Sequence, residues 1–338
     1  MLESTNLTQV KISVLVPCYN VEKYVLQCLQ SLACQTHKNI EVICIDDGST
    51  DRTAAILNDF SLKDERFKVL SKNNSGYGDS MNKGLSAVTG SYVGIVESDD
   101  FIEPTMFEDL LTAAVRNDLD FVRTGFLYYY EKDEATRLEI SDFVEKLIVL
   151  NPLFHKSFFY QMPAIWAGLY KKEFLDKNEI GFLPTPGASY QDTSFTFKVN
   201  FCAKRVMMIA GAHYYYRQHP ESSVNSKGKV YCVCDEWEEA IKFASKDPER
   251  FNQVKTITLQ LVMNSYRWNY DRLSGTSKHE FLKKWTSDLR KWGHIGVVIP
   301  SEATKKEKVE YWLLTNFPAL YSIARVANNY INKLRKRN

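Results

Sequence analysis

The segment that most constrains this chain is residues 92–100, Tyr-Val-Gly-Ile-Val-Glu-Ser-Asp-Asp, where an uncharged run leads directly into three carboxylates. The run 92–96 predicts a buried strand. Carboxylates so close together repel one another and raise one another's pKa, so we expect a positive group nearby. Oxygen ligands of this kind suit Mg²⁺ or Mn²⁺. The alternative is a solvated acidic turn before a helix that begins near Pro104.

Apolar and amphipathic segments alternate over residues 11–130. Strands are predicted at 11–17, 40–45, 67–70, 92–96 and 119–130. Helices are predicted between them, at 21–35, up to 63, up to 90 and at 104–117, and Asn20 is expected to cap the first. This alternation predicts an α/β fold with a mostly parallel, doubly wound sheet.

Polar residues follow three of these strands where each strand ends. They are Pro17-Cys18-Tyr19-Asn20, Asp46-Asp47 and Glu97-Ser98-Asp99-Asp100. Ligands of such sheets bind outside the carboxyl ends of the strands, so we expect the three clusters to share one site. The alternative is that polar turns simply fall at strand ends.

Several other kinds of site are excluded. The chain has no G-x-G-x-x-G after the first strand and no G-x-x-x-x-G-K-[ST], so neither a dinucleotide-binding Rossmann site nor a P-loop is supported. It has no Cys-x-x-Cys pair, which argues against structural zinc. The net charge of +2 gives no reason to expect a nucleic-acid partner. A chain without a glycine-rich cradle can hold a diphosphate through a metal bound by the acids of 97–100.

These segments resemble the family-2 glycosyltransferases of the GT-A fold, over roughly residues 10–225. The matching signatures are Val16-Pro17-Cys18-Tyr19-Asn20, Ile45-Asp46-Asp47-Gly48-Ser49-Thr50-Asp51, Glu97-Ser98-Asp99-Asp100 in place of D-x-D, and Gln191-Asp192 in place of E-D. The resemblance implies that Asp192 is the general base and that Asp99 is a ligand for Mn²⁺ or Mg²⁺. The alternative for Asp192, which lies at the polar entry to the amphipathic run 195–199, is an N-cap or first-turn acid of a helix, where the helix dipole favours it. The resemblance also implies a nucleotide-sugar site formed by Pro17, Tyr19, Asn20, Asp46, Asp47, Gly76, Lys83, Glu97, Ser98 and Asp99. In that site Pro17 and Tyr19 would border the nucleobase, and Asp47 would form a hydrogen bond with it.

Two positions depart from the family pattern. Glu97 stands where Asp is usual, which leaves its direct role open. Met81 stands where the family's N-x-G…A-R-N-x-G element has Arg. Lys83 is expected either to compensate for that arginine or to be an exposed helix lysine.

A further set of residues is expected at the acceptor or diphosphate side: Asp100, Trp166, Gln191, Arg217 and His219. Trp166 either stacks on a sugar or is a core aromatic residue. Arg217 and His219 either reach the diphosphate, with His219 as a second metal ligand, or belong to a surface loop.

The pattern changes near residue 229 to long helical stretches. We therefore expect a catalytic domain at 10–228 and a helical subdomain at 229–338. Aromatic residues of the last stretch and the basic segment 333–337 predict contact with an anionic membrane, and a packed helix with a frayed basic end is the alternative. The absence of a signal pattern at residues 1–10 and of a long apolar run predicts a cytoplasmic protein, or one attached peripherally to the inner face of the membrane.

Together these features predict an inverting glycosyltransferase, because direct attack assisted by one base inverts the anomeric carbon. The expected donor is a nucleoside-diphosphate sugar, with UDP as the nucleotide, and the expected acceptor is a glycan or lipid-linked glycan of bacterial surface-polysaccharide assembly. The alternatives are a sugar nucleotidyl- or phosphotransferase and a non-catalytic sugar-nucleotide or glycan-binding protein.

Overall fold

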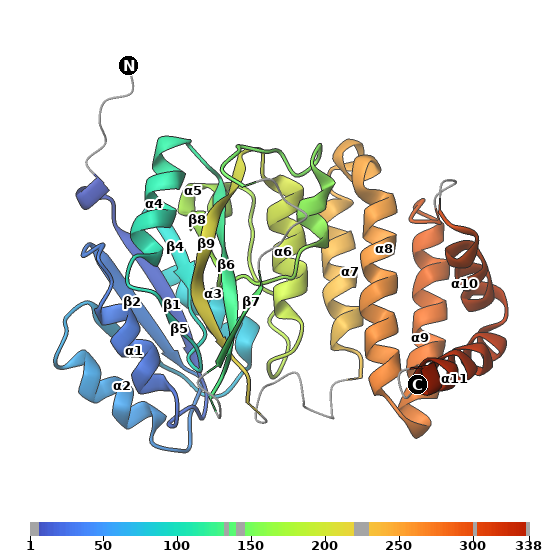
Figure 1. The fold of residues 1–338 in the computed structure, drawn as a ribbon, viewed down its shortest axis with the longest axis horizontal. Helices are drawn as coiled ribbons and strands as arrows, with labels where there is room; N and C mark the ends of the chain where they lie inside the picture. The colour runs from blue at the N-terminus through green and yellow to red at the C-terminus, as the bar shows by residue number, and fades with distance from the viewer. Residues whose placement is uncertain (1–6, 132–134, 140–145, 220–229, 300–302, 336–338) are drawn as a thin grey trace. The chain divides into compact units, whose positions relative to one another are not determined.

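The computed structural model describes residues 7–131, 135–139, 146–219, 230–299 and 303–335. The chain forms two compact units, Met1–Ser226 and Lys227–Asn338. The strands drawn in Figure 1 belong to the first unit.

The first unit is built on one mixed sheet with the strand order β3-β2-β1-β4-β8-β6-β9-β5, and β7 pairs with β6. The strands are β1 (Ile12–Cys18), β2 (Ile40–Asp46), β3 (Phe67–Ser71), β4 (Tyr92–Ile95), β5 (Phe101–Ile102), β6 (Phe121–Tyr130), β7 (Ala135–Glu139), β8 (Gly168–Lys171) and β9 (Val206–Arg217). Every residue of β1 and β2 is buried, as expected for central strands of a sheet covered on both faces.

The N-terminal half of the sheet is parallel, as predicted. β1 is parallel to both β2 and β4, and β2 is parallel to β3. In the second half, β8 is antiparallel to both β4 and β6, so β6 runs in the same direction as β4. β9 follows that direction, whereas β5 and β7 oppose it. Six of these nine strands therefore share one direction.

Helices connect the strands of this unit: α1 (Val25–Ala33), α2 (Thr53–Ser61), α3 (Tyr77–Ala87), α4 (Met106–Arg116), α5 (Lys172–Lys177) and α6 (Gln191–Cys202), with short turns η1 (Leu7–Gln9) and η2 (Lys156–Tyr160). α1 buries the apolar stripe that its sequence predicts, Val25, Cys28, Leu29 and Leu32.

The predicted cap of α1 is wrong. α1 begins at Val25 after Tyr24, not at residue 21. Asn20 instead adopts a left-handed backbone with φ 53°. Its Oδ1 accepts a hydrogen bond from the backbone N–H of Thr50 at 2.8 Å, so Asn20 stabilises the loop after β2 and does not cap the helix.

The second unit consists of helices in its described part: α7 (Cys232–Ala244), α8 (Pro248–Arg272), α9 (Gly275–Gly293), α10 (Lys305–Asn316) and α11 (Pro318–Arg335). Large aromatic residues fill its core, and Tyr266, Tyr270, Phe281 and Trp285 are 0–1% exposed. None of the described helices is both long enough and apolar enough to cross a lipid bilayer.

Gly94 allows β4 to pack against α4, and this contact generates a stability prediction. A Cβ at Gly94 would lie 2.5 Å from Cε1 of Phe107, which is fully buried. We expect Gly94→Ala to lower the free energy of unfolding by about 1–3 kcal/mol, because the Phe107 ring must move within a packed core. Denaturant unfolding measures this, with the exposed Ser91→Ala as control. Equal stability of the two variants would contradict the packing argument.

Candidate active site

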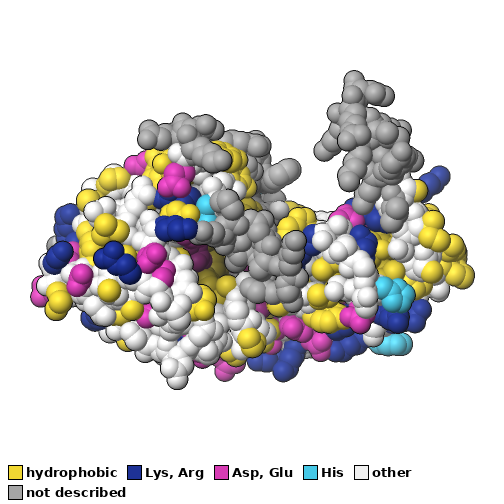
Figure 2. Space-filling view, turned by 90° about the horizontal axis from the view of Figure 1, so that it is seen from below, with side chains coloured by type: hydrophobic (Ala, Val, Ile, Leu, Met, Phe, Trp, Pro, Cys, Tyr) yellow, Lys and Arg dark blue, Asp and Glu magenta, His cyan; other side chains and the backbone are white. Residues whose placement is uncertain are grey.

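Three strands end side by side at the predicted site. β1 lies between β2 and β4, and Cys18 at its end pairs with Asp46 at the end of β2. The backbone N–H of Val96 still bonds to Leu15, so the acids that follow β4 emerge at the same edge. Figure 2 shows acidic side chains within a hollow on the face of the first unit seen from below. The predicted shared edge is therefore present.

Asp99 and His219 meet although they are far apart in the sequence. His219 Nε2 lies 2.9 Å from Asp99 Oδ2. The His219 side chain is 7% exposed and that of Asp99 is 33% exposed, so the carboxylate keeps access to solvent. His219 Nδ1 is buried and has no hydrogen-bond partner among the described residues. A carboxylate oxygen and an imidazole nitrogen thus face each other at the rim of the site.

Residues of β9 hold the acidic loop, residues 97–100, in place. The Tyr214 hydroxyl donates to Asp100 Oδ2 at 2.7 Å and accepts the backbone N–H of Glu97 at 3.0 Å. The backbone N–H of Arg217 donates to Asp100 Oδ1 at 2.8 Å. Burial and the neighbouring carboxylate of Asp99 raise the pKa of Asp100 well above its usual range. Asp100 is 1% exposed, so it anchors the loop and does not reach the surface.

Arg217 is predicted to reach a diphosphate or to belong to a surface loop, and the structure places it buried at the end of β9. Its Nε donates to the Asp99 carbonyl at 2.8 Å, its Nη1 to Glu131 at 3.1 Å, and its Nη2 to Gln27. The guanidinium also lies over three rings, those of Tyr24, Phe101 and Tyr129. All three nitrogens of its side chain donate hydrogen bonds within the protein, so Arg217 stabilises the acidic loop.

Glu97 faces the interior of the site together with Tyr77 and Asp192. The Tyr77 hydroxyl donates to Glu97 Oε1 at 2.7 Å. Burial, with smaller contributions from Asp99 and Asp192, raises the pKa of Glu97 to about 8. Because Asp192 contributes to this shift, its carboxyl group lies near that of Glu97. Glu97, the departure from the usual Asp, therefore belongs to the same cluster.

Asp192 lies in the first turn of α6, as the helix-start alternative predicts, and its role as a general base stays a prediction. Burial raises its pKa to about 6, and hydrogen bonds with Thr193 oppose that shift. Partial positive charge at the helix N-terminus favours the ionised form of an acid in the first turn. A carboxylate with a pKa of about 6 is ionised at neutral pH and is still able to accept a proton.

The Asp47 carboxylate accepts several hydrogen bonds from within the protein, which the sequence did not indicate. Its Oδ1 accepts from Lys72 and from the backbone N–H of Ser75 at 2.9 Å, and its Oδ2 accepts the N–H of Gly76 at 2.9 Å. Asp47 is 6% exposed. The predicted hydrogen bond to a nucleobase would have to share this carboxylate, whose observed role is to hold the 72–76 segment.

Gly76 lets two loops of the site touch. Its φ is +100°, and a Cβ there would lie 2.5 Å from the Thr185 carbonyl, so no other residue fits without displacement. The N–H of Tyr77 donates to the Gly187 carbonyl at 2.9 Å. Gln191 Nε2 donates to Thr185 Oγ1 at 3.1 Å and is buried, so Gln191 organises this loop just before Asp192.

The remaining predicted residues divide by exposure. Tyr19 is 49% exposed beside the end of β1, where Pro17 pairs with Ile45. Asp46 is 4% exposed, and its Oδ1 accepts the N–H of Ser49 at 3.0 Å. Of this group, Tyr19 is the side chain that is open to a ligand.

Three further predicted positions are structural in their contacts. Lys83 is exposed and pairs with Asp79 at 3.3 Å, four residues away on α3. Ser98 is buried beside Cys18. Trp166 is 6% exposed and stacks on Tyr214 with ring centroids 4.2 Å apart, which matches the core alternative stated above.

Sequence reasoning missed Lys72, Tyr77 and Tyr214. Lys72 directly follows β3, which ends at the same edge as β2, so the rule that located the acids also indicates this lysine. Its side chain is 7% exposed and pairs with Asp79 at 3.1 Å in addition to Asp47. Tyr77 and Tyr214 carried no comparable signal, because their partners are distant in sequence.

Known proteins are similar to this chain in sequence. Residues 13–174 match the family model described as glycosyl transferase family 2. The uncharacterized glycosyltransferase EpsJ of Bacillus subtilis is 32% identical over 62% of this chain. The glycosyltransferase GlyG of Streptococcus pneumoniae is 32% identical over 64% of this chain and 73% of its own length. The chain spans 62% of the length of EpsJ and likewise of EpsH.

Solved structures agree on the fold. Staphylococcus aureus TarS 1–349, in a complex with UDP-GlcNAc, superposes with a TM-score of 0.74 over 94% of this chain and 92% of the TarS chain, at 21% identity. TarS 1–349 in complex with UDP superposes with a TM-score of 0.63 at 22% identity. This chain therefore belongs to glycosyltransferase family 2 and has the GT-A fold.

Proposed function

We propose that this enzyme transfers a sugar from a UDP-sugar to a hydroxyl group of a glycan or lipid-linked glycan, with inversion at the anomeric carbon. The observation that carries the proposal is that His219 contacts Asp99, while Glu97 of the same acidic loop is close enough to Asp192 of α6 for the two carboxyl groups to interact electrostatically. The similar TarS structures, which are complexes with UDP-GlcNAc and with UDP, favour uridine as the nucleotide. The pathway that the family resemblance suggests is assembly of a bacterial surface polysaccharide.

Asp99 and His219 fit a divalent cation. A carboxylate oxygen and an imidazole nitrogen 2.9 Å apart form a donor set that suits Mn²⁺ and, with more water ligands, Mg²⁺. The described residues contain no cluster of three metal-ligating side chains, so diphosphate oxygens and water would complete the coordination. When bound, this cation supplies positive charge to the departing diphosphate. Arg217 and Tyr214 keep the Asp99 loop in place for that role.

Asp192 is proposed as the general base. Its ionised carboxylate accepts the proton of the acceptor hydroxyl as that oxygen attacks the anomeric carbon from the face opposite the diphosphate. Tyr77 and Glu97 lie near Asp192. Of the two carboxyl groups, that of Asp192 has the lower pKa, about 6 against about 8 for Glu97. The loop held by Gly76, Gly187 and Gln191 positions the first turn of α6, which carries Asp192.

A surface of the second unit favours contact with anionic lipid. Trp312 on α10, Phe317 between the two helices, and Leu320 and Ile323 on α11 are 46–67% exposed, although Leu314 of α10 and Tyr321 of α11 are buried. Residues 305–338 contain eight Lys or Arg and two Glu. The basic segment 333–337 lies partly outside the described residues. Exposed apolar side chains within a basic segment match the chemistry of an anionic membrane surface.

Asp192→Asn tests the base. We expect kcat for sugar transfer to fall about 10²–10⁴-fold, because the amide cannot accept the proton. Binding of the UDP-sugar should persist, and Asp59→Asn on the exposed face of α2 should leave both unchanged. In the unmodified enzyme, activity should fall as the pH drops through about 6, where Asp192 becomes protonated.

The assay measures release of the matching nucleoside diphosphate from a panel of UDP-, GDP-, CDP- and dTDP-sugars with Mn²⁺, and UDP is the product expected from the UDP-sugars. A sugar nucleotidyl- or phosphotransferase would release no UDP from these donors. A non-catalytic binding protein would bind the nucleotide yet release no UDP in either form of the protein.

His219→Ala tests the metal site. We expect it to weaken Mn²⁺-dependent thermal stabilisation by UDP, because a ligand that binds the folded state raises Tm and His219 would help to hold the cation on which that binding depends. His279→Ala, at an exposed position of α9, is the matched control. Unchanged Mn²⁺ dependence in His219→Ala would exclude His219 as a ligand while leaving the base assignment intact.

Leu320→Glu with Ile323→Glu tests the membrane surface. We expect the unmodified protein to sediment with vesicles of anionic lipid at low salt, and the double variant to remain in the supernatant. Leu62→Glu, at the 86% exposed Leu62 of the first unit, controls for added charge. If the unmodified protein fails to sediment with anionic vesicles, the membrane assignment is wrong.

A further inference from the structure

Arg123 of β6 is a buried cation that the proposed reaction does not use. It is 6% exposed. Its Nη1 donates to Gln161 Oε1 at 3.3 Å, and its Nη2 donates to the carbonyls of Met162 at 2.9 Å and Ala164 at 3.3 Å. All three acceptors are uncharged. Its Nε has no partner, and no ion pair joins it to an acid, in the part of the chain that the structure describes.

The positive charge of Arg123 persists at physiological pH. Burial lowers its pKa, but an arginine in a protein remains protonated even so. A buried charge without a counter-charge is costly, and buried arginines are normally paired with carboxylates. The fold therefore places an uncompensated cation between β6 and the 161–166 loop.

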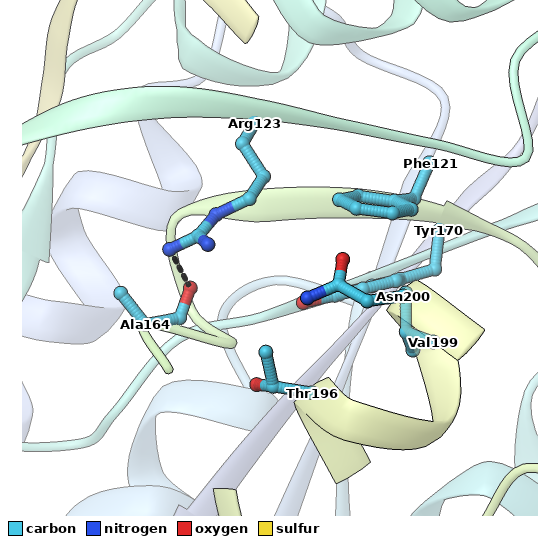
Figure 3. Close-up of a pocket in the computed structure, with 7 residues that line it drawn as sticks. All are labelled: Phe121, Arg123, Ala164, Tyr170, Thr196, Val199 and Asn200. Carbon is cyan, nitrogen blue, oxygen red and sulfur yellow. Dashed lines mark hydrogen bonds between the residues drawn. The ribbon is translucent and has the colours of Figure 1, made fainter. Parts of the chain in front are cut away.

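A small cavity adjoins this guanidinium. Its volume is about 10 Å³, and its lining comes from β6, β8, α6 and the 161–166 loop. The lining residues are Phe121, Arg123, Ala164, Tyr170, Thr196, Val199 and Asn200. Figure 3 shows the Arg123 guanidinium and the Asn200 amide on opposite sides of this space, with Thr196 on a third side.

The polar groups at the cavity offer several N–H and O–H donors, and the Asn200 amide oxygen is an acceptor among them. Arg123 offers its unpaired Nε–H. The Asn200 amide donates one N–H to the Phe158 carbonyl at 3.2 Å and carries a second. Thr196 contributes a hydroxyl group from α6. Nearby, Gln161 Nε2 also lacks a partner among the described residues.

We propose that this cavity binds one monatomic anion, chloride under ordinary conditions, as the counter-ion of Arg123. A cavity of this volume has room for a single water-sized species, which excludes sulfate, phosphate and carboxylates. A bound anion turns the unpaired Nε–H into a charge-assisted hydrogen bond. Since Thr196 and Asn200 belong to α6, the anion ties β6 to the helix whose first turn carries Asp192.

Crystals grown in chloride and measured at long wavelength test the occupant directly, because chloride scatters anomalously there and water does not. We expect an anomalous peak in the cavity within hydrogen-bond distance of Arg123 Nε. Electron density without an anomalous peak would identify a water molecule, and this result, like an empty cavity, overturns the proposal. The test uses no UDP-sugar, so its outcome is independent of the proposed transferase activity.

Thermal unfolding supplies the second test. At constant ionic strength, replacing gluconate by chloride should raise the Tm of the unmodified protein by about 2 °C or more, because the anion binds the folded state. Arg123→Met should lose this response. Arg205→Met is the matched control, since Arg205 also donates to main-chain carbonyls, those of Asn117 and Asp118, but is exposed.

Thr196→Val is the variant to use if Arg123→Met does not fold. It keeps the side-chain volume and removes the hydroxyl group, so it should weaken the chloride response. A chloride response that is equal in the unmodified protein, Arg123→Met and Thr196→Val would overturn the proposal. The same conclusion follows if chloride does not stabilise the unmodified protein.

Discussion

The active site depends on how the chain holds several carboxylates together. Tyr214 joins the Glu97 backbone to the Asp100 carboxylate, and Arg217 adds a backbone bond to Asp100 and a side-chain bond to the Asp99 carbonyl. These bonds stabilise a loop whose acids would otherwise repel one another. Asp100 is therefore used for structure, while Asp99 keeps a partly exposed carboxylate beside His219. One end of β9 thus fixes both the loop and its imidazole neighbour.

A second set of contacts connects the donor side with the proposed base. Asp47 holds the 72–76 segment through Lys72 and two backbone N–H groups. That segment ends at Gly76, which lies against the 185–187 loop. The loop then leads into α6 and Asp192. The acid after β2 is thereby linked mechanically to the acid of α6, although 145 positions, 47 to 192, separate them in the sequence.

Much of the fold followed from periodicity and from the ends of strands. The parallel order of the first strands, the buried stripe of α1 and the helical second unit agree with the predictions. The antiparallel β8 and the short β5 did not follow, because such pairings depend on partners far along the chain. Asn20 was misassigned as a cap, since its side chain has a long-range partner, Thr50, that competes with local capping.

The sequence by itself determined which residue types stand at the strand ends, and therefore the family, the carboxylate cluster and the position of Asp192 at a helix start. Only the tertiary structure decided how each polar residue is used. Arg217, Asp47 and Trp166 carry the chemistry of ligand-binding residues, yet the fold engages them internally. The physical reason is that hydrogen-bond partners, burial and pKa shifts arise from neighbours brought together by folding, which linear spacing does not encode.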